Sequence, residues 1–121
     1  MEVKDLMIGD WVEVDGEYTD VTSISRTEIS TGCMKEVDIR DVKPIPITAQ
    51  CLDDSGFHTN QFLSILRVDH NHYLEVDSDE GVILWEEKSV IRTVKFMAKV
   101  KYVHELQHAL RLCNINKGIE L

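Results

Sequence analysis

The sequence predicts an α+β protein that is mainly β: an N-terminal SH3-like small barrel or meander, then an antiparallel meander and a C-terminal amphipathic helix. Three observations indicate this fold class. Short runs rich in β-branched residues alternate with turn signals from Trp11 to Val100. Pro44-Ile45-Pro46 interrupts these runs near the middle and forces an extended backbone. The last segment, Tyr102 to Cys113, contains strong helix formers and neither Gly nor Pro.

The first half, residues 6–47, has the pattern of a compact β unit. Trp11 to Val14 begins a strand, and Asp15-Gly16 signals a hairpin because a type I′ turn requires positive φ angles. The second strand contains Tyr18, Val21 and Ile24, and residues 26–31 form the third. Val37, Ile39 and Val42 indicate a fourth strand. Short strands joined by tight turns favour an SH3-like barrel or a curled meander.

Residues 48–121 are expected to form the second half. Thr48 is a good N-cap for one or two helical turns, and Gly56 is placed to end them. The expected strands of an antiparallel meander are residues 62–68, 73–76, 82–85 and 90–100, with Ile119 and Leu121 in a short terminal strand. No Gly/Ser- or Pro-rich linker separates the halves, so residues 1–121 are expected to pack as one domain with sub-halves 1–47 and 48–121.

The composition limits the classes of function. The 121 residues amount to about one average domain. They include 22 acidic and 13 basic residues, a formal net charge of −9. Nucleic-acid binding requires Lys and Arg to neutralise phosphates, so this charge argues against a nucleic-acid ligand. It favours a basic protein partner, and it leaves open that the surface imitates a nucleic acid.

The cysteines and the hydropathy pattern indicate a cytoplasmic protein. Cys33, Cys51 and Cys113 are odd in number and form no CxxC pair, so disulfide bonds are not expected. The segment Met1 to Asp5 is charged and does not resemble a signal peptide. The apolar runs are only a few residues long, whereas a membrane span needs about 20 residues.

One string resembles a catalytic motif. His104-Glu105-Leu106-Gln107-His108 matches HExxH, in which two histidines four apart on a helix bind zinc. The glutamate then deprotonates the metal-bound water. A zinc-dependent hydrolase with His104 and His108 as metal ligands and Glu105 as catalytic base is therefore one hypothesis.

The rest of the chain argues against that hypothesis. A catalytic zinc needs a third protein ligand. The long form of the motif requires Gly and then His, where this chain has Arg111 and Asn114, and Glu120 lies on a tail too short for a second ligand helix. His58 or His70 could supply the ligand from a distant segment. We therefore expect no cofactor, with zinc as the alternative, and favour a structural role for the string.

A helical wheel supports the structural interpretation. At about 100° per residue, the apolar side chains gather on one face: Tyr102, Val103, Leu106, Ala109, Leu110 and Cys113. His104, His108 and Arg111 fall on the opposite face. The wheel predicts a helix that packs on a sheet and directs both histidines to solvent.

Weaker signals have simpler explanations. Asp69, His70 and His72 could bind a surface metal, but a polar hairpin tip is favoured. Asp77, Asp79 and Glu80 before Gly81, with Glu87 after it, resemble part of a calcium loop. Val76 replaces its first ligand and the flanks are strands, so a turn is expected. Trp11 and Trp85 could stack on a ligand, although packing is the commoner role.

Three segments carry a resemblance to other proteins: residues 5–12 (DLMIGDWV), residues 44–48 (PIPIT) with Gly56-Phe57, and residues 102–107 (YVHELQ). They resemble small uncharacterised proteins of gut Bacteroidetes, which are often encoded in mobile or phage-derived regions. In that group the ending varies as His-x-Leu-Gln without a dependable second histidine. The resemblance implies that His108 is incidental, and it implies a genomic setting without a mechanism.

These observations favour a non-enzymatic protein-interaction or accessory domain, related to phages or mobile elements. In this interpretation an acidic β surface binds a protein partner, itself basic, and nucleic acids and membranes are not partners. The zinc hydrolase and the acidic nucleic-acid mimic are the two alternatives.

Overall fold

The chain divides into two compact units, Met1–Ile45 and Pro46–Leu121. The boundary falls within the Pro44-Ile45-Pro46 segment, where two prolines limit regular strand pairing. The computed structural model describes residues 1–32, 36–55, 57, 65–69, 71–77, 81–88, 93–115, 118–119 and 121. Gly56, the expected end of the short helix, lies outside these residues, as does Cys33.

The first unit is an antiparallel sheet of five strands in the order β4-β3-β2-β1-β5. Its elements along the chain are η1 (Val3–Asp5), β1 (Trp11–Val14), β2 (Glu17–Ile24), β3 (Glu28–Thr31), β4 (Glu36–Asp38), η2 (Ile39–Asp41) and β5 (Val42–Lys43). Asp15 and Gly16 have φ angles of 51° and 80°, which confirms the predicted hairpin turn between β1 and β2.

The last expected strand of this unit is divided in two. Val37 lies in β4 and Val42 in β5, while Ile39 lies in the intervening 3-10 turn η2. Asp38 begins that turn by accepting the backbone N–H of Arg40 at 2.9 Å. The turn reverses the chain so that β5 pairs with β1 instead of continuing beside β3. The result is an SH3-like strand order in an open sheet, not a closed barrel.

Alternation along the strands builds the core of the first unit. Val12 and Val14 are buried in β1, whereas Trp11 and Glu13, which alternate with them, are half-buried. The core consists of Leu6, Val12, Val14, Val21, Ile29, Val37 and Val42. Trp11 lies on the outer side of this alternation, so its ring is not part of that core.

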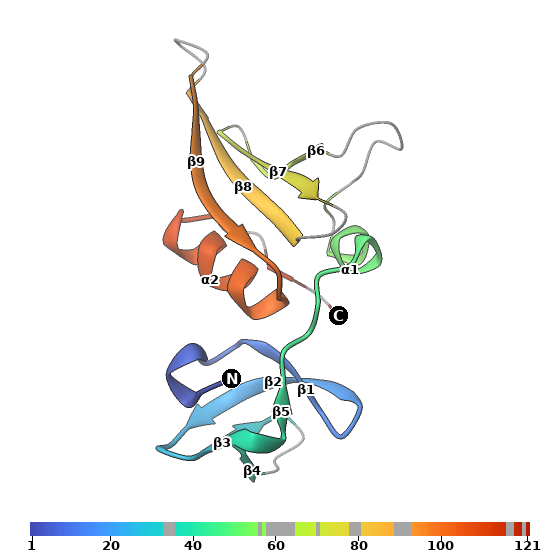
Figure 1. Ribbon diagram of the computed structural model, residues 1–121, viewed down its shortest axis with the longest axis vertical. Coiled ribbons are helices and arrows are strands. Elements are labelled where there is room, and N and C mark those ends of the chain that lie inside the picture. Colours follow the sequence, from blue (N-terminus) through green and yellow to red (C-terminus); the bar gives the residue numbers. More distant parts are fainter. Residues whose placement is uncertain are drawn as a thin grey trace. The chain divides into compact units, whose positions relative to one another are not determined.

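The second unit contains an antiparallel sheet in the order β6-β7-β8-β9 and two helices. Its elements are α1 (Ala49–Asp54), β6 (Ile65–Arg67), β7 (His72–Asp77), β8 (Gly81–Lys88), β9 (Thr93–Val100) and α2 (Val103–Leu112). The predicted N-cap is confirmed, because the Thr48 hydroxyl accepts the Cys51 N–H at 3.1 Å. In Figure 1 the strands form one twisted sheet, and α2 runs beside β9.

The two faces of this sheet differ. Leu74, Val82 and Leu84 are buried and lie on the face that α2 covers. Tyr73 and Trp85, which are next to Leu74 and Leu84 in sequence, project to the other face and are only half-buried. Sites on the two faces are therefore separated by the thickness of the sheet.

Helix α2 ends where the sequence predicts. Asn114 has a φ angle of 60°, the left-handed conformation that stops a helix. Ile119 is buried, but it belongs to no strand, so the expected terminal strand is wrong for the described residues 118–119 and 121. Within the described part of the chain, α1 and α2 are both too short to cross a bilayer.

Candidate functional site

The histidines of the HExxH string do not both face solvent, so the prediction from the helical wheel is wrong for His104. Its side chain is 7% exposed. The imidazole stacks on the Tyr102 ring, with centroids 6.1 Å apart, and meets the His108 ring edge-on at 5.8 Å. His104 is therefore buried on a flank that the wheel assigned to water. His108 is half-buried and Arg111 is exposed.

Glu105 has a structural role at the start of the helix. Its Oε1 atom accepts the backbone N–H groups of Lys101 at 3.1 Å and Tyr102 at 3.0 Å. Glu105 is the third residue of α2, the position from which a glutamate reaches back to the N-cap. Helix capping thus accounts for the glutamate of the string without any catalytic step.

The part of the chain that the structure describes shows no third ligand for the zinc hypothesis. Among the residues that the structure describes, no group of three or more His, Cys, Asp or Glu side chains is arranged to hold a metal ion. His58 and His70, the candidate third ligands, lie outside the described residues, as does Glu120. The zinc site of His104 and His108 therefore stays a prediction.

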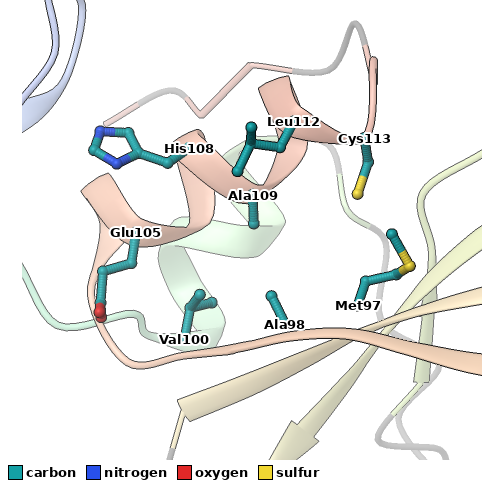
Figure 2. A pocket seen from close by; sticks show the side chains of 8 residues that line it. All are labelled: Met97, Ala98, Val100, Glu105, His108, Ala109, Leu112 and Cys113. Atoms are coloured by element: carbon teal, nitrogen blue, oxygen red, sulfur yellow. The ribbon is translucent and has the colours of Figure 1, made fainter.

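A groove opens between α2 and β9, and it includes two residues of the string. Figure 2 shows Glu105 and His108 near one end and Cys113 at the other. The volume is about 480 Å³, within the range of ligand pockets. The lining consists of Met97, Ala98, Val100, Glu105, His108, Ala109, Leu112 and Cys113.

Two features of the sequence create the groove. Leu84 pairs with Ala98 and Trp85 with Phe96, so Met97 is an extra residue that forms a β-bulge. A bulge redirects side chains, and Met97 and Ala98 both line the groove. Ala98 and Ala109 are small, and Figure 2 shows open space between them. No sequence motif marks this groove, because a bulge and a pair of facing alanines arise from the pairing of separate segments.

Negative charge lies at the Cys113 end of the groove. Burial, followed by the negative charges of Glu86 and Asp69, raises the pKa of the Cys113 thiol above its ordinary value. The thiol is therefore neutral near pH 7 and lacks the lowered pKa of a nucleophilic cysteine. Glu105 places a carboxylate at the other end. The groove is mostly apolar, with the Glu105 carboxylate in its lining at one end and the Glu86 and Asp69 carboxylates outside the lining, near Cys113.

His72 is not the solvated tip residue that the hairpin pattern suggested. It is 9% exposed at the start of β7. Its Nδ1 lies 2.9 Å from Asp69 Oδ1, and its Nε2 lies 3.8 Å from Glu86 Oε2. Asp69 thus fixes the imidazole by a hydrogen bond, and the Glu86 carboxylate lies beyond hydrogen-bond distance on the other side of the ring. His70 lies outside the described residues.

The resemblance to a calcium loop does not extend to the flanking structure. Asp77 pairs with Gly81, so the segment joins two hairpin strands rather than two helices. Asp79 and Glu80 lie outside the described residues.

Comparison of the chain with protein-family models, curated proteins and solved structures found no match.

Proposed function

We propose that this protein is a non-enzymatic interaction domain that binds a basic protein segment in the groove between α2 and β9. The observation that carries the proposal is an apolar groove with the Glu105 carboxylate in its lining and two further carboxylates, Glu86 and Asp69, near its Cys113 end. Protein-binding grooves commonly take one or two apolar anchor side chains and surround them with charged groups. A partner with apolar residues flanked by Lys or Arg matches this arrangement.

The apolar part of the site supplies affinity. Leu112 is 88% exposed at the rim, and Met97 and Ala98 are half-buried along β9. A leucine side chain is usually buried in a folded protein. A partner that covers Leu112 would remove its apolar surface from water, and this burial would favour binding. Burial of one partner Leu or Ile side chain contributes about 1.5–3 kcal/mol.

The charged part supplies selectivity. Glu105, Glu86 and Asp69 are negative, and the chain as a whole has a net charge of −9. Opposite charge on the partner accelerates the encounter and disfavours acidic competitors. The capping bonds use Oε1 of Glu105, and a carboxylate has two oxygens, so a basic side chain can still be attracted to Oε2.

Peptide display on the purified protein tests the proposal. Peptides are selected for binding to wild-type protein and then measured against Ala98→Leu, which fills the groove with a larger side chain. We expect the selected peptides to combine Lys or Arg with large apolar residues. Ala98→Leu should weaken their binding about tenfold, a loss of ~1.4 kcal/mol. Ile8→Ala, at a 64% exposed apolar residue of the first unit, is the matched control.

Nuclear magnetic resonance locates the bound peptide. The amide signals of Met97, Ala98, Ala109 and Leu112 should move on titration, and they should move less at high salt. Peptides that bind Ala98→Leu as tightly as the wild type, or that are enriched in Asp and Glu, would contradict the proposal. A spectrum of free Ala98→Leu that matches the wild type away from the groove shows that the variant is folded.

The nucleic-acid mimic is less well supported. It requires carboxylates spaced along one face like phosphates. On the face of the β6–β9 sheet opposite α2, Glu75 and Glu87 are interrupted by aromatic rings and by Lys99, which pairs with Ile83.

A further inference from the structure

Three aromatic rings form a row across the sheet face opposite the groove. Tyr73 of β7 pairs with Trp85 of β8, and Trp85 pairs with Phe96 of β9. The Tyr73 and Trp85 rings are stacked, with centroids 6.4 Å apart and planes at 20°. The Trp85 and Phe96 rings meet at 81° with centroids 5.8 Å apart. The row therefore presents rings in two orientations, stacked between Tyr73 and Trp85 and edge-on between Trp85 and Phe96.

This row is accessible from solvent. Phe96 is 54% exposed, and Val94, two residues before it on the same face, is 49% exposed. Tyr73 and Trp85 are half-buried. A run of aromatic and aliphatic surface across three strands indicates an interaction site, because soluble proteins rarely leave such contiguous patches uncovered.

A carboxylate is fixed beside the rings. Glu75 Oε2 accepts the indole N–H of Trp85 at 2.9 Å. This bond holds the indole plane in place and keeps a negative charge at the edge of the row. Glu87, which pairs with Val94, adds a second carboxylate on the same face. The faces of aromatic rings are themselves negative, so the rings and the carboxylates attract the same kind of group.

We propose that this aromatic row is a second binding site and that it takes the alkylammonium group of a lysine, plain or methylated, on a protein segment. Cation–π attraction and the Glu75 charge act together on such a group, and its methylene or methyl groups pack against the rings. Sheets with exposed aromatic residues also bind single-stranded nucleic acid. Lys99 of β9 lies on the same face, but Glu75 is the charged group bonded directly to a ring of the row, so the charge at the rings repels phosphates and favours the cation.

This site is separate from the groove and goes beyond the proposed function. Tyr73, Trp85 and Phe96 lie on one face of the sheet, and α2 covers the other. A partner can therefore contact one site, or both sites through two segments. Failure of either proposal leaves the other standing.

The test compares three short peptides of the same sequence that differ at one side chain: lysine, trimethyllysine and a neutral tert-butyl analogue of trimethyllysine. Binding is followed by the indole N–H signal of Trp85 at constant ionic strength, with the Trp11 indole signal as an internal reference. We expect the trimethyllysine peptide to bind about 3- to 30-fold more tightly than the neutral analogue, which corresponds to one cation–π contact.

Two variants assign the effect to the row. Phe96→Leu keeps an apolar side chain but removes one ring. Glu75→Gln keeps an oxygen that can accept the Trp85 N–H but removes the charge. Each should reduce the preference for the charged peptide, and because Phe96 is exposed and Gln retains the hydrogen bond, both variants should fold. An unchanged near-ultraviolet circular dichroism spectrum checks this.

Three results would overturn the inference. One is equal binding of the neutral and charged peptides. Another is binding of an oligothymidylate strand to the row in place of the cationic peptides. The third is loss of the Trp85 response in Ala98→Leu, which would place the cation in the groove.

Discussion

The Glu105 carboxylate accepts the backbone N–H of Tyr102 at 3.0 Å and so closes the first turn of α2 on itself. The same oxygen accepts the N–H of Lys101 at 3.1 Å. A glutamate that completes a catalytic motif by its spacing thus satisfies two backbone donors that a helix start otherwise leaves without a helical partner. Glu105 is thus both the glutamate of the HExxH string and the third residue of α2, from which a glutamate caps the helix.

Removal of this cap should lower stability. We expect Glu105→Ala to reduce the free energy of unfolding by about 0.5–2 kcal/mol, as for other lost helix caps. Glu105→Gln should lose much less, because its amide oxygen still accepts hydrogen bonds. Urea unfolding followed by circular dichroism at 222 nm measures both. Equal losses in the two variants would show that the charge matters and the hydrogen bonds do not.

Two leucines of α2 offer a matched comparison of burial. Leu106 is fully buried and Leu112 is 88% exposed. Leu106→Ala should cost about 2–5 kcal/mol because it removes buried methyl groups and leaves a cavity. Leu112→Ala should change stability by less than about 0.5 kcal/mol. Thermal and urea unfolding of both variants check the difference, and a large loss for Leu112→Ala would mean that this side chain is covered.

Gly81 cannot take a side chain in the hairpin between β7 and β8. Its φ angle is +99°, and an added Cβ would collide with the Val100 carbonyl oxygen and lie 2.9 Å from Lys101 Cα. Gly81→Ala should cost about 2–4 kcal/mol from strain and overpacking. Gly16 has a φ angle of +80° but open space around it, so Gly16→Ala should cost only about 1–2 kcal/mol. Similar urea midpoints for the two variants would contradict the collision.

Asp69 predicts a dependence of stability on pH. Burial by itself raises the pKa of Asp69, but hydrogen bonds from the Asn71 N–H and from the His72 ring outweigh it, and the net pKa lies below its ordinary value. A carboxyl whose pKa is lower in the folded state stabilises the fold above its unfolded pKa, about 3.9. This contribution is lost as the pH falls through the lower, folded pKa.

Comparison of wild type with Asp69→Asn isolates that contribution. The side chain is 40% exposed, so solvent screens it and the difference should stay below about 1 kcal/mol. The wild type should be the more stable protein from pH 7 down to about pH 4, and the two urea midpoints should converge below that. A difference that grows as the pH falls would have the wrong sign for this mechanism.

The sequence determined features that depend on neighbours along the chain. Asp15-Gly16 gave the hairpin, Thr48 the helix cap and Asn114 the helix end, because each depends on backbone conformation within a few residues. Alternation of apolar and polar residues likewise predicted the strands, and the apolar face of residues 102–113 predicted the amphipathic helix.

The tertiary structure decided what depends on distant partners. His104 is 7% exposed although the wheel places it opposite the apolar side chains, because a wheel describes the helix without the rest of the chain. The groove needs a bulge at Met97 and a short residue on each side, and the aromatic row needs the register of three strands. Register and bulges are set by pairing between segments far apart in sequence, so no local pattern reveals which side chains meet.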